Sequence, residues 1–386
     1  MPRQYIERYR AELLERIMPF WMTHSPDPEY GGFFTCLDRS GAVYDPRKYV
    51  WMNGRQVWTL CKLYNEVEPR DAWLDAARPA AEFLRQHVFD RQGRCWFRLT
   101  KEGRPAGYQR KPYAAVFTML GFLEYSKATG DHSYRQLAES MFARIQDWIR
   151  DPSLLGRPEV AGGPPMSQLA DLYVNLFMGL ELGGETGANA IAGALKGLEA
   201  HFETSQNLLL ESAVLDPACR FDYPEGRLIC AGSIFEVSWL VLQALRAAPD
   251  EAMKQRILET LDCALHFSWD REHDGFFYFQ DLQGKPGLPL EWSQKLWWVH
   301  VEAICAVAHA YAETGEPKWM RWLEVADDYI FRHFPDPQYG EWFGYLEREG
   351  KPSQTLKGGA YKGCFHIPRA LWLSARELER SLSPQR

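Results

Sequence analysis

The chain has 386 residues, of which 46% are hydrophobic and 25% are charged, and this ordinary globular composition excludes a largely disordered protein. Its net charge of −7, without a long basic run, makes nucleic acid or an anionic membrane an unfavourable partner. Aromatic residues make up 14% of the chain, which suits a pocket whose rings stack on sugar faces.

The chain carries no signal for export or membrane insertion. Its first residues, MPRQYIERYRAELLERI, are charged on every turn and lack the apolar core of a signal peptide. No run approaches the ~18 apolar residues of a membrane-spanning helix. The eight cysteines lie apart without a CxxC pair, as expected of reduced thiols rather than a disulfide or zinc framework. A cytoplasmic location is therefore expected.

Apolar residues recur at helical spacing along most of the chain. In chain order, this periodicity predicts helices over residues 3–22, 51–66, 71–88, 113–129, 133–149, 166–183, 187–204, 233–247, 250–268, 293–314, 317–333 and 365–380. Strand-like alternation is confined to short pieces beside turn residues. The chain is therefore predicted to be mostly helical.

The short strand-like pieces repeat. Asp27, Asp270 and Asp336 each open a turn that leads into a short aromatic strand and a second turn closed by glycine, and Asp90 opens a weaker copy. Each copy predicts a small hairpin. The spacings from 27 to 90 and from 270 to 336, which are 63 and 66 residues, equal about one helix–hairpin–helix unit and indicate a repeat architecture.

Twelve helices in six pairs, with hairpins on alternate connections, predict an all-α fold, an (α/α)6 barrel with short β-hairpins between helices. Residues 293–314 are nearly all apolar, as an inner helix should be, whereas residues 317–333 are amphipathic, as an outer helix should be. Because no composition break divides the chain, residues 1–386 are expected to form a single domain.

Two polar residues on apolar stretches are candidates for a site at one end of the inner helices. Arg55 lies between Trp51 and Trp58, and a buried guanidinium needs partners, which could be sugar hydroxyls, a carboxylate or a neighbouring helix. Glu236 opens an apolar helix, where the helix dipole keeps a carboxylate ionised. Taken alone, Glu236 is better explained as an ordinary helix-start residue, whereas for Arg55 the two explanations are equally good.

Two later helices add stronger candidates. Trp298 and Glu302 lie four residues apart on one face of an apolar helix, so Glu302 must be paired or must line a cavity, and we favour the cavity. His300 on another face is expected to be a hydrogen-bonded core histidine. His366 and Arg369 lie three apart at the start of the last helix, where a histidine beside a cation stays neutral, as a general base must.

Other catalytic patterns are missing from the sequence. There is no HxH or HExxH metal set, no GxGxxG after a strand and no GxSxG nucleophile turn, so no metal is predicted and dinucleotide or serine-hydrolase chemistry is poorly supported. The loop with Gly358, Gly359 and Lys362 could hold a phosphate, although it lacks P-loop spacing.

At these clusters the chain resembles the N-acylglucosamine 2-epimerase family, which includes the renin-binding proteins. The resemblance spans residues 20 to 375 and implies an (α/α)6 barrel. It also implies a cofactor-independent sugar isomerase that opens the ring, removes the C2 proton and returns a proton to the other face or to C1. Family members act on N-acetylglucosamine and N-acetylmannosamine, or on mannose, glucose, fructose or cellobiose. The matching strings include GGFFTCLDRSGAVYD (31–45), KYVWMNGRQVW (48–58), LEWSQKLWWVHVEA (290–303) and LKGGAYKGCFHIPRA (356–370).

The resemblance assigns roles to single residues. His366 resembles the C-terminal catalytic histidine of the family, and Glu236 resembles the glutamate that follows the second catalytic histidine. Arg55, Glu302 and Arg369 resemble substrate-binding residues of the family. Glu236 and Trp298 are also expected to bind the substrate. The family is often stimulated by ATP, and the loop with Gly358 and Lys362 lies where it carries a glycine-rich motif. The expected partner is a small-molecule sugar, with no nucleic acid or membrane, and a homodimer is expected.

One position departs from the family pattern. Ser233 stands where the family's GHxxE string places the second catalytic histidine, and an unassisted serine is a far weaker base than imidazole. The leading hypothesis is a sugar 2-epimerase with His366 as the general base. The alternatives are a one-base aldose–ketose isomerase, an inactive sugar-binding relative, or an (α/α)6 glycoside hydrolase that uses Glu236 and Glu302.

Overall fold

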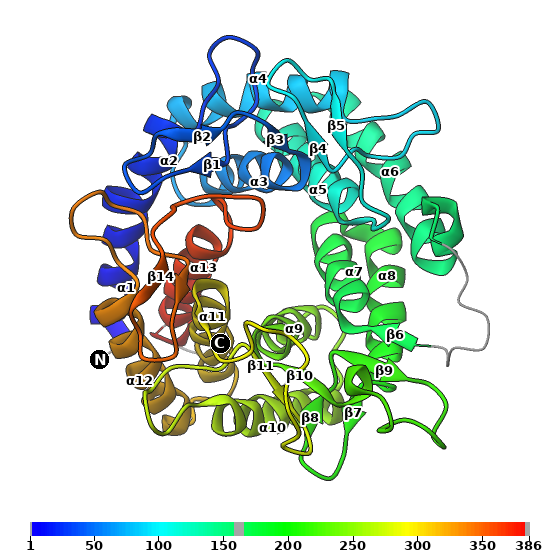
Figure 1. Cartoon of the computed structure of the whole chain (residues 1–386), viewed down its shortest axis with the longest axis vertical. Coiled ribbons are helices and arrows are strands. Elements are labelled where there is room, and N and C mark those ends of the chain that lie inside the picture. The colour runs from blue at the N-terminus through cyan, green and yellow to red at the C-terminus, as the bar shows by residue number, and fades with distance from the viewer. Residues whose placement is uncertain (1, 158–165, 383–386) are drawn as a thin grey trace.

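The computed structural model describes residues 2–157 and 166–382. Within these ranges the helices form two concentric rings, as in an (α/α)6 barrel, with the first and last helices side by side (Figure 1). The predicted fold class is therefore confirmed. No helix in the described part of the chain is long and apolar enough to cross a membrane.

The inner ring consists of α3 (Val50–Glu66), α5 (Tyr113–Thr129), α7 (Leu169–Leu182), α9 (Ala231–Ala244), α11 (Trp297–Thr314) and α13 (His366–Leu382). The outer ring consists of α4 (Asp71–His87), α6 (His132–Arg150), α8 (Gly184–Leu198), α10 (Glu251–Ser268) and α12 (Pro317–His333), with α1 (Pro2–Ala11) and α2 (Met18–His24) joined by the π-helical turn η1 (Glu12–Ile17). Two short 3-10 helices, η2 (Pro152–Leu155) and η3 (Pro224–Arg227), lie in the connections.

Burial separates the two rings as the apolar pattern predicts. Almost every residue from Val299 to Ala310 on α11 is buried, because this helix packs between α9 and α13 as well as against the outer ring. On α12 the buried residues, among them Trp319, Leu323 and Ile330, recur every three to four positions and share one face. An inner helix must be apolar on all sides, whereas an outer helix needs one apolar face.

The helix predicted over residues 293–314 begins only at Trp297. Lys295–Leu296 form a strand instead, because their backbone pairs with Tyr345–Leu346. Residues 166–168 likewise form a strand before α7, and the helix predicted over 187–204 ends at Leu198 ahead of a strand at Phe202–Glu203. Backbone pairing replaces the predicted helix at these positions, with distant segments for residues 166–168 and 295–296 and with the nearby Leu208–Leu209 for Phe202–Glu203.

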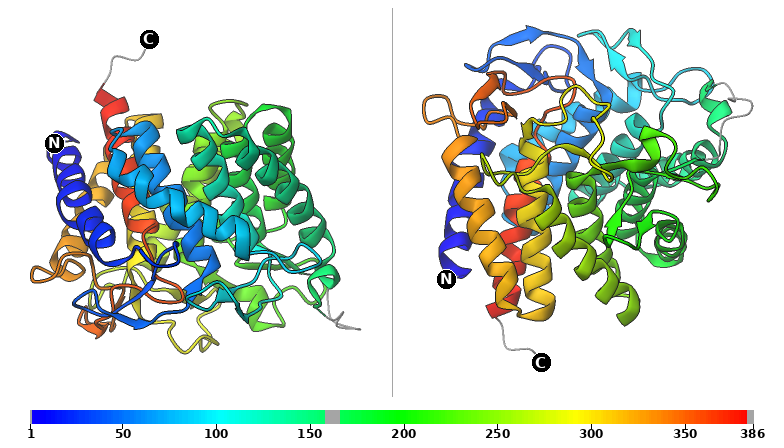
Figure 2. Two further views of the ribbon diagram at one scale, coloured as in Figure 1. Left: turned by 90° about the horizontal axis from the view of Figure 1, so that it is seen from above. Right: turned by 60° about the horizontal axis from the view of Figure 1, so that its bottom comes forward.

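The strands form small antiparallel sheets, ordered β1-β2, β3-β4-β5, β6-β9, β7-β8, β10-β11 and β12-β13-β14. They gather at one end of the helices, and the C-terminal end of α13 lies at the other (Figure 2). The strands are β1 (Cys36–Leu37), β2 (Val43–Asp45), β3 (Lys48–Tyr49), β4 (Arg98–Leu99), β5 (Pro105–Gly107), β6 (Met166–Gln168), β7 (Phe202–Glu203), β8 (Leu208–Leu209), β9 (Ser212–Val214), β10 (Leu228–Cys230), β11 (Phe279–Asp281), β12 (Lys295–Leu296), β13 (Tyr345–Leu346) and β14 (Pro352–Gln354).

Three of the four predicted hairpins are present. The copies that begin at Asp27, Asp90 and Asp336 form β1–β2, β4–β5 and β13–β14. The hairpin predicted after Asp270 is wrong, because its strand β11 pairs with β10 from the preceding connection. Each of the four copies nevertheless contains an isolated antiparallel β-bridge ahead of its strand. The bridges are Pro26–Phe33, Phe89–Cys95, Trp269–Phe276 and Pro335–Trp342.

In three copies the repeated aspartate forms a buried ion pair with a lysine ahead of an inner helix. Asp27 pairs with Lys48 at 2.7 Å before α3, and Asp270 pairs with Lys295 at 3.0 Å before α11. Asp336 pairs with Lys357 at 2.9 Å before α13. These pairs tie each strand-bearing connection to the start of an inner helix, where the polar candidates lie.

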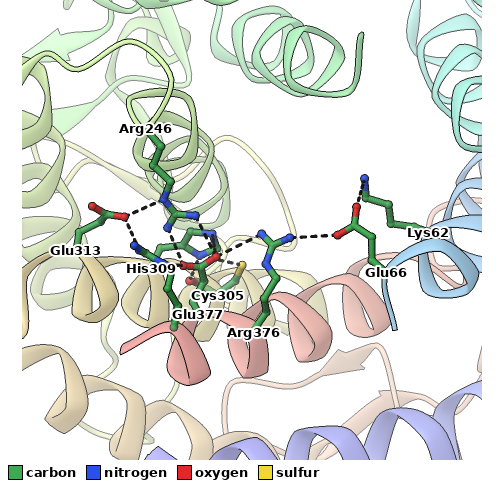
Figure 3. A network of polar contacts seen from close by, with 9 residues as sticks. Lys62, Glu66, Arg246, Cys305, His309, Glu313, Arg376 and Glu377 are labelled. Carbon is green, nitrogen blue, oxygen red and sulfur yellow. Dashed lines mark hydrogen bonds and ion pairs between the residues drawn. The ribbon is translucent and has the colours of Figure 1, made fainter. Parts of the chain in front are cut away.

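A second polar network connects the inner helices to one another at the ends away from the strands (Figure 3). Glu377 on α13 accepts hydrogen bonds from Arg246 at 2.7 Å, just after α9, and from Arg380 at 2.9 Å. Arg376 extends the network to Glu66 at the end of α3. Because Glu377 lies eleven residues beyond His366, the network is ~16 Å along α13 from the catalytic candidates.

Candidate active site

The starts of α3, α9, α11 and α13 surround a pocket of about 440 Å³ at the strand-bearing end of the barrel. Its size is that of a small-ligand site. The lining combines aromatic rings with a few charged groups, which suits a sugar. The lining residues include Trp51, Arg55, Tyr173, Glu236, Tyr278, Trp298, Tyr345, Tyr361 and His366.

His366 is held at its Nδ1 atom. This nitrogen lies 2.8 Å from Oε1 of Glu302, which also accepts a hydrogen bond from Nη2 of Arg369 at 2.7 Å. The other Glu302 oxygen accepts from the Trp239 indole at 2.7 Å. Since a carboxylate only accepts, Nδ1 carries the proton, and Nε2 keeps its lone pair on the pocket side.

The electrostatic surroundings keep His366 neutral. Burial lowers the pKa of His366 well below its ordinary value, and the Arg55 and Arg369 cations lower it further, whereas Glu236 opposes them. A histidine that is neutral at physiological pH, with one nitrogen fixed and the other free, meets the requirements of a general base.

Arg55 presents a cation without an ion pair. Its guanidinium lies over the rings of Phe117 at 3.9 Å and Trp51 at 4.6 Å, and its Nε has no hydrogen-bond partner among the described residues. Burial lowers the pKa of Arg55 to about 9, although Glu236 opposes this. A buried cation with a free N–H can be satisfied by an oxygen of a bound ligand.

Glu236, Glu302 and Arg369 form one cluster. Arg369 donates to Glu236 at 2.6 Å and to Glu302 at 2.7 Å through the same nitrogen. Together with His366, these carboxylates bring three metal-ligand atoms within 4.8 Å, a grouping that the sequence motifs did not indicate. The Arg369 guanidinium bonds both carboxylates and so supplies the positive charge between them.

Trp298 lies on the pocket wall, and its ring centroid is 5.7 Å from that of His366. A Cβ atom on Gly232 would come within 2.4 Å of the Trp298 ring, so the glycine before Ser233 lets the indole pack against α9. His300 lies in the core: its Nδ1 donates to the Leu296 carbonyl at 2.7 Å, and its Nε2 accepts from the Phe276 N–H.

The loop with Gly358, Gly359 and Lys362 does not present a phosphate site, contrary to the sequence interpretation. Lys362 is fully buried, and its ammonium donates to Glu341 at 2.7 Å and to the Lys357 carbonyl at 2.8 Å. A Cβ on Gly358 would lie 2.2 Å from the Thr35 carbonyl oxygen. The glycine and the lysine are therefore explained by packing beneath the start of α13.

Ser233 lies on the first turn of α9. The sequence analysis did not identify its neighbour Glu211 as a candidate site residue. The Glu211 carboxyl, at the residue before β9, lies close enough to Ser233 for the hydroxyl to affect its ionisation. Nothing in the string Leu208-Leu209-Leu210-Glu211 marks it as a site residue, apart from an acidic residue directly after an apolar run.

An aromatic pocket that holds a neutral histidine and a buried cation is suited to an enzyme that binds a sugar and moves a proton. The family model of N-acylglucosamine 2-epimerase (GlcNAc 2-epimerase) matches residues 32–162 and 188–370. The chain belongs to the N-acylglucosamine 2-epimerase family, and it is a sugar epimerase or isomerase.

Individual relatives agree with this assignment. The chain is 39% identical to the N-acylglucosamine 2-epimerase of Bos taurus, over 97% of this chain and 91% of that protein. In fold it is similar to a D-mannose isomerase, with a TM-score of 0.83 at 17% identity over 96% and 97% of the two chains. A cellobiose 2-epimerase from Spirochaeta thermophila DSM 6192 gives a TM-score of 0.82 at 22% identity over 99% and 98%.

Proposed function

We propose that the protein interconverts an N-acylglucosamine and the corresponding N-acylmannosamine by inverting C2. The observation that carries the proposal is the fixed, neutral His366 at an aromatic pocket. The name of the 39% identical relative supports the N-acyl substrate.

In the proposed mechanism, the ring-opened sugar places its C2–H bond against His366. Nε2 removes this proton, and the electron pair delocalises onto the C1 oxygen as an enolate. Arg55 is suited to stabilise that oxygen, because its guanidinium has an unpartnered N–H and no competing carboxylate contact. A proton then returns to C2 from the other face. Only protons move, so we propose that the reaction uses no cofactor.

A one-base aldose–ketose isomerisation is the second candidate, and the serine at position 233 favours it. It begins with the same C2 proton removal and differs in returning the proton to C1. A glycoside hydrolase is disfavoured, because Glu236 and Glu302 both hold Arg369, and Glu302 also holds His366. Neither carboxyl is thus free to act as the proton-donating acid.

Three expectations stay predictions from the sequence: a single domain over residues 1–386, a homodimer and a cytoplasmic location. ATP stimulation also stays a prediction, and the packing of Lys362 gives it no support at the glycine loop.

The test is to incubate the protein in D2O with N-acetylglucosamine, N-acetylmannosamine, mannose, glucose and fructose separately, and to follow C2 by NMR. We expect deuterium at C2 of both N-acetyl sugars and their interconversion. His266→Asn, a surface histidine variant, is the matched control and should behave as the unmodified protein. Exchange confined to mannose and fructose would establish the isomerase instead, and no exchange in any sugar would overturn both.

A further inference from the structure

The proposed mechanism does not use the carboxyl of Glu211, a residue whose backbone is bonded to the strand that leads into α9. Glu211 is fixed at the point where two inner helices begin. Its N–H donates to the Leu228 carbonyl at 2.9 Å, on the strand that leads into α9, and its carbonyl accepts from the N–H of Leu169 at 2.9 Å, the first residue of α7. The backbone therefore holds Glu211 rigidly against the start of α9, where Ser233 lies.

The Glu211 carboxyl is short of partners. Its Oε2 atom is buried and has no hydrogen-bond partner among the described residues, a costly arrangement that needs an explanation. The Ser233 hydroxyl is its neighbour on α9. Three residues that line the pocket are close enough to interact with it electrostatically, Tyr173, Glu236 and Tyr278, and so are Lys111, Tyr113 and Cys230 outside the pocket.

These surroundings give the carboxyl two accessible protonation states. Burial raises the pKa of Glu211 to about 7, with a further contribution from Glu236, while Ser233 and Lys111 lower it. Near neutral pH the group is therefore present both with and without its proton. A residue that gives a proton in one direction of a reversible reaction and takes it in the other needs this property.

We propose that Glu211 and Ser233 together form the second proton-transfer unit of the epimerase, in place of a second histidine. Ser233 lies three residues before Glu236, which lines the pocket, on the same side of α9, and is the member assigned to C2, whereas Glu211 is a positioning and proton-relay residue behind it. The inference rests on the proposed function. His366 on α13 and Ser233 on α9 lie on either side of α11, so the two units approach the pocket from different helices (Figure 1).

The proton balance closes in both directions. When Nε2 of His366 takes the C2 proton, the Ser233 hydroxyl gives its proton to the opposite face of C2, and the Glu211 carboxyl passes its own proton to the serine oxygen. This leaves an imidazolium and a carboxylate. In the reverse direction the Glu211 carboxylate takes the hydroxyl proton, Ser233 takes the C2 proton and the imidazolium protonates C2. Exchange with solvent restores each group between turnovers.

The experiment separates the two half-reactions. Starting from each N-acetyl sugar alone in D2O, both C2 deuterium incorporation into the starting sugar and conversion to the other are measured. We expect Glu211→Gln to reduce conversion by about 100-fold or more, as for loss of a general acid–base group. For the epimer that His366 deprotonates, the rate of C2 deuterium exchange in Glu211→Gln should stay within about threefold of the rate in the unmodified protein. Ser233→Ala should give the same pattern, and the surface variant Glu225→Gln should change nothing.

Each other outcome overturns the inference. Unchanged conversion in Glu211→Gln and Ser233→Ala would show that the pair moves no proton. Equal loss of exchange from both epimers, with a lowered melting temperature, would show that Glu211 only supports the fold. If the unmodified protein exchanges C2 without forming the epimer, the one-base isomerase replaces this inference and the N-acyl epimerase. No exchange at all would overturn the proposed function itself.

Discussion

The buried charges of Glu377 at one end of the inner helices and of Arg55 and Glu211 at the other differ in how completely they are paired. At the end drawn in Figure 3, His309, Arg246 and Arg376 hold the pKa of Glu377 below its usual range, although burial opposes this. At the pocket end, burial prevails for Arg55 and Glu211. It lowers the pKa of Arg55 to about 9 and raises that of Glu211 to about 7, and both groups keep an unpartnered atom.

The difference shows where stability and function lie in this barrel. A carboxylate that several cations compensate, as Glu377 is, holds helices together and offers nothing to a ligand. Charges left short of partners cost stability and are retained where a substrate completes them. Breaking the far network should therefore lower stability while leaving the chemistry intact, whereas removing pocket charges should do the reverse.

The largest effect is expected for His366→Asn. The amide can still occupy the site beside Glu302 but cannot accept the C2 proton, so C2 exchange from the epimer that His366 serves should fall by about 10²–10⁴-fold or more. NMR exchange in D2O and the melting temperature check this. His309→Asn is the comparison at the far end: it should lower the melting temperature and keep the exchange rate. If the two variants behave alike, the two ends do not differ as we infer.

The next effect is on stability, in Glu377→Gln. The neutral amide leaves the arginines around it without their shared anion. Because these arginines are partly exposed, the loss should be about 1–3 kcal/mol, below the ~3–5 kcal/mol of a fully buried pair. Denaturant unfolding measures it. Turnover per folded molecule should match the unmodified protein, and a large loss of turnover would show that this network reaches the site.

The sequence predicted the helical frame well, because periodicity is a local signal. The inner and outer helices follow from whether apolar residues cover all sides or one face, as on α11 and α12. Strand pairing could not be predicted in the same way. The partner of β11 is β10, about fifty residues earlier in the chain, and no local pattern in the repeat at Asp270 indicates that pairing.

The same difference between local sequence signals and tertiary contacts applies to the residues of the site. The structure brings His366 and Arg369 together, as their spacing at the start of the last helix suggests. The cavity position favoured for Glu302 is wrong, because Glu302 is fully buried and bonds both of these residues instead of lining the pocket. Glu211 could not be found from sequence, because its environment is made by α7, α9 and the strand before α9 rather than by its neighbours in the chain. At Lys362 the glycine-rich string left a phosphate loop open as a weak possibility, whereas the lysine is fully buried and bonded to Glu341.

A smaller effect is expected for Arg55→Met. The side chain keeps its contacts with the Trp51 and Phe117 rings but loses a buried charge that has no carboxylate partner. The free energy of unfolding should stay the same or rise by up to about 1 kcal/mol. The KM for the sugar should rise about 10-fold or more, as for loss of a charged hydrogen bond. Thermal unfolding and steady-state kinetics test both parts, and a marked loss of stability would contradict the contrast between the two ends.

The smallest effect is expected on the pH dependence of stability, through the Asp336–Lys357 ion pair at the strand-bearing end of the barrel. Like the pairs around Glu377, this pair should stabilise the fold. Although burial opposes it, Arg39 and Lys357 hold the pKa of Asp336 below its usual range. A carboxyl whose pKa is lower in the folded state stabilises the fold above its unfolded value of ~3.9, and this contribution is lost as the pH falls below it.

We therefore expect the free energy of unfolding to fall between about pH 5 and pH 3 in the unmodified protein. Asp336→Asn should be less stable at pH 7 but less sensitive to acid, because the amide has no proton to gain. Denaturant unfolding at a series of pH values measures both, with the exposed Asp222→Asn variant as the control. An equally steep acid dependence in Asp336→Asn would show that the repeated aspartate–lysine pairs do not secure the starts of the inner helices through their charge, and that the strand pairing alone positions His366.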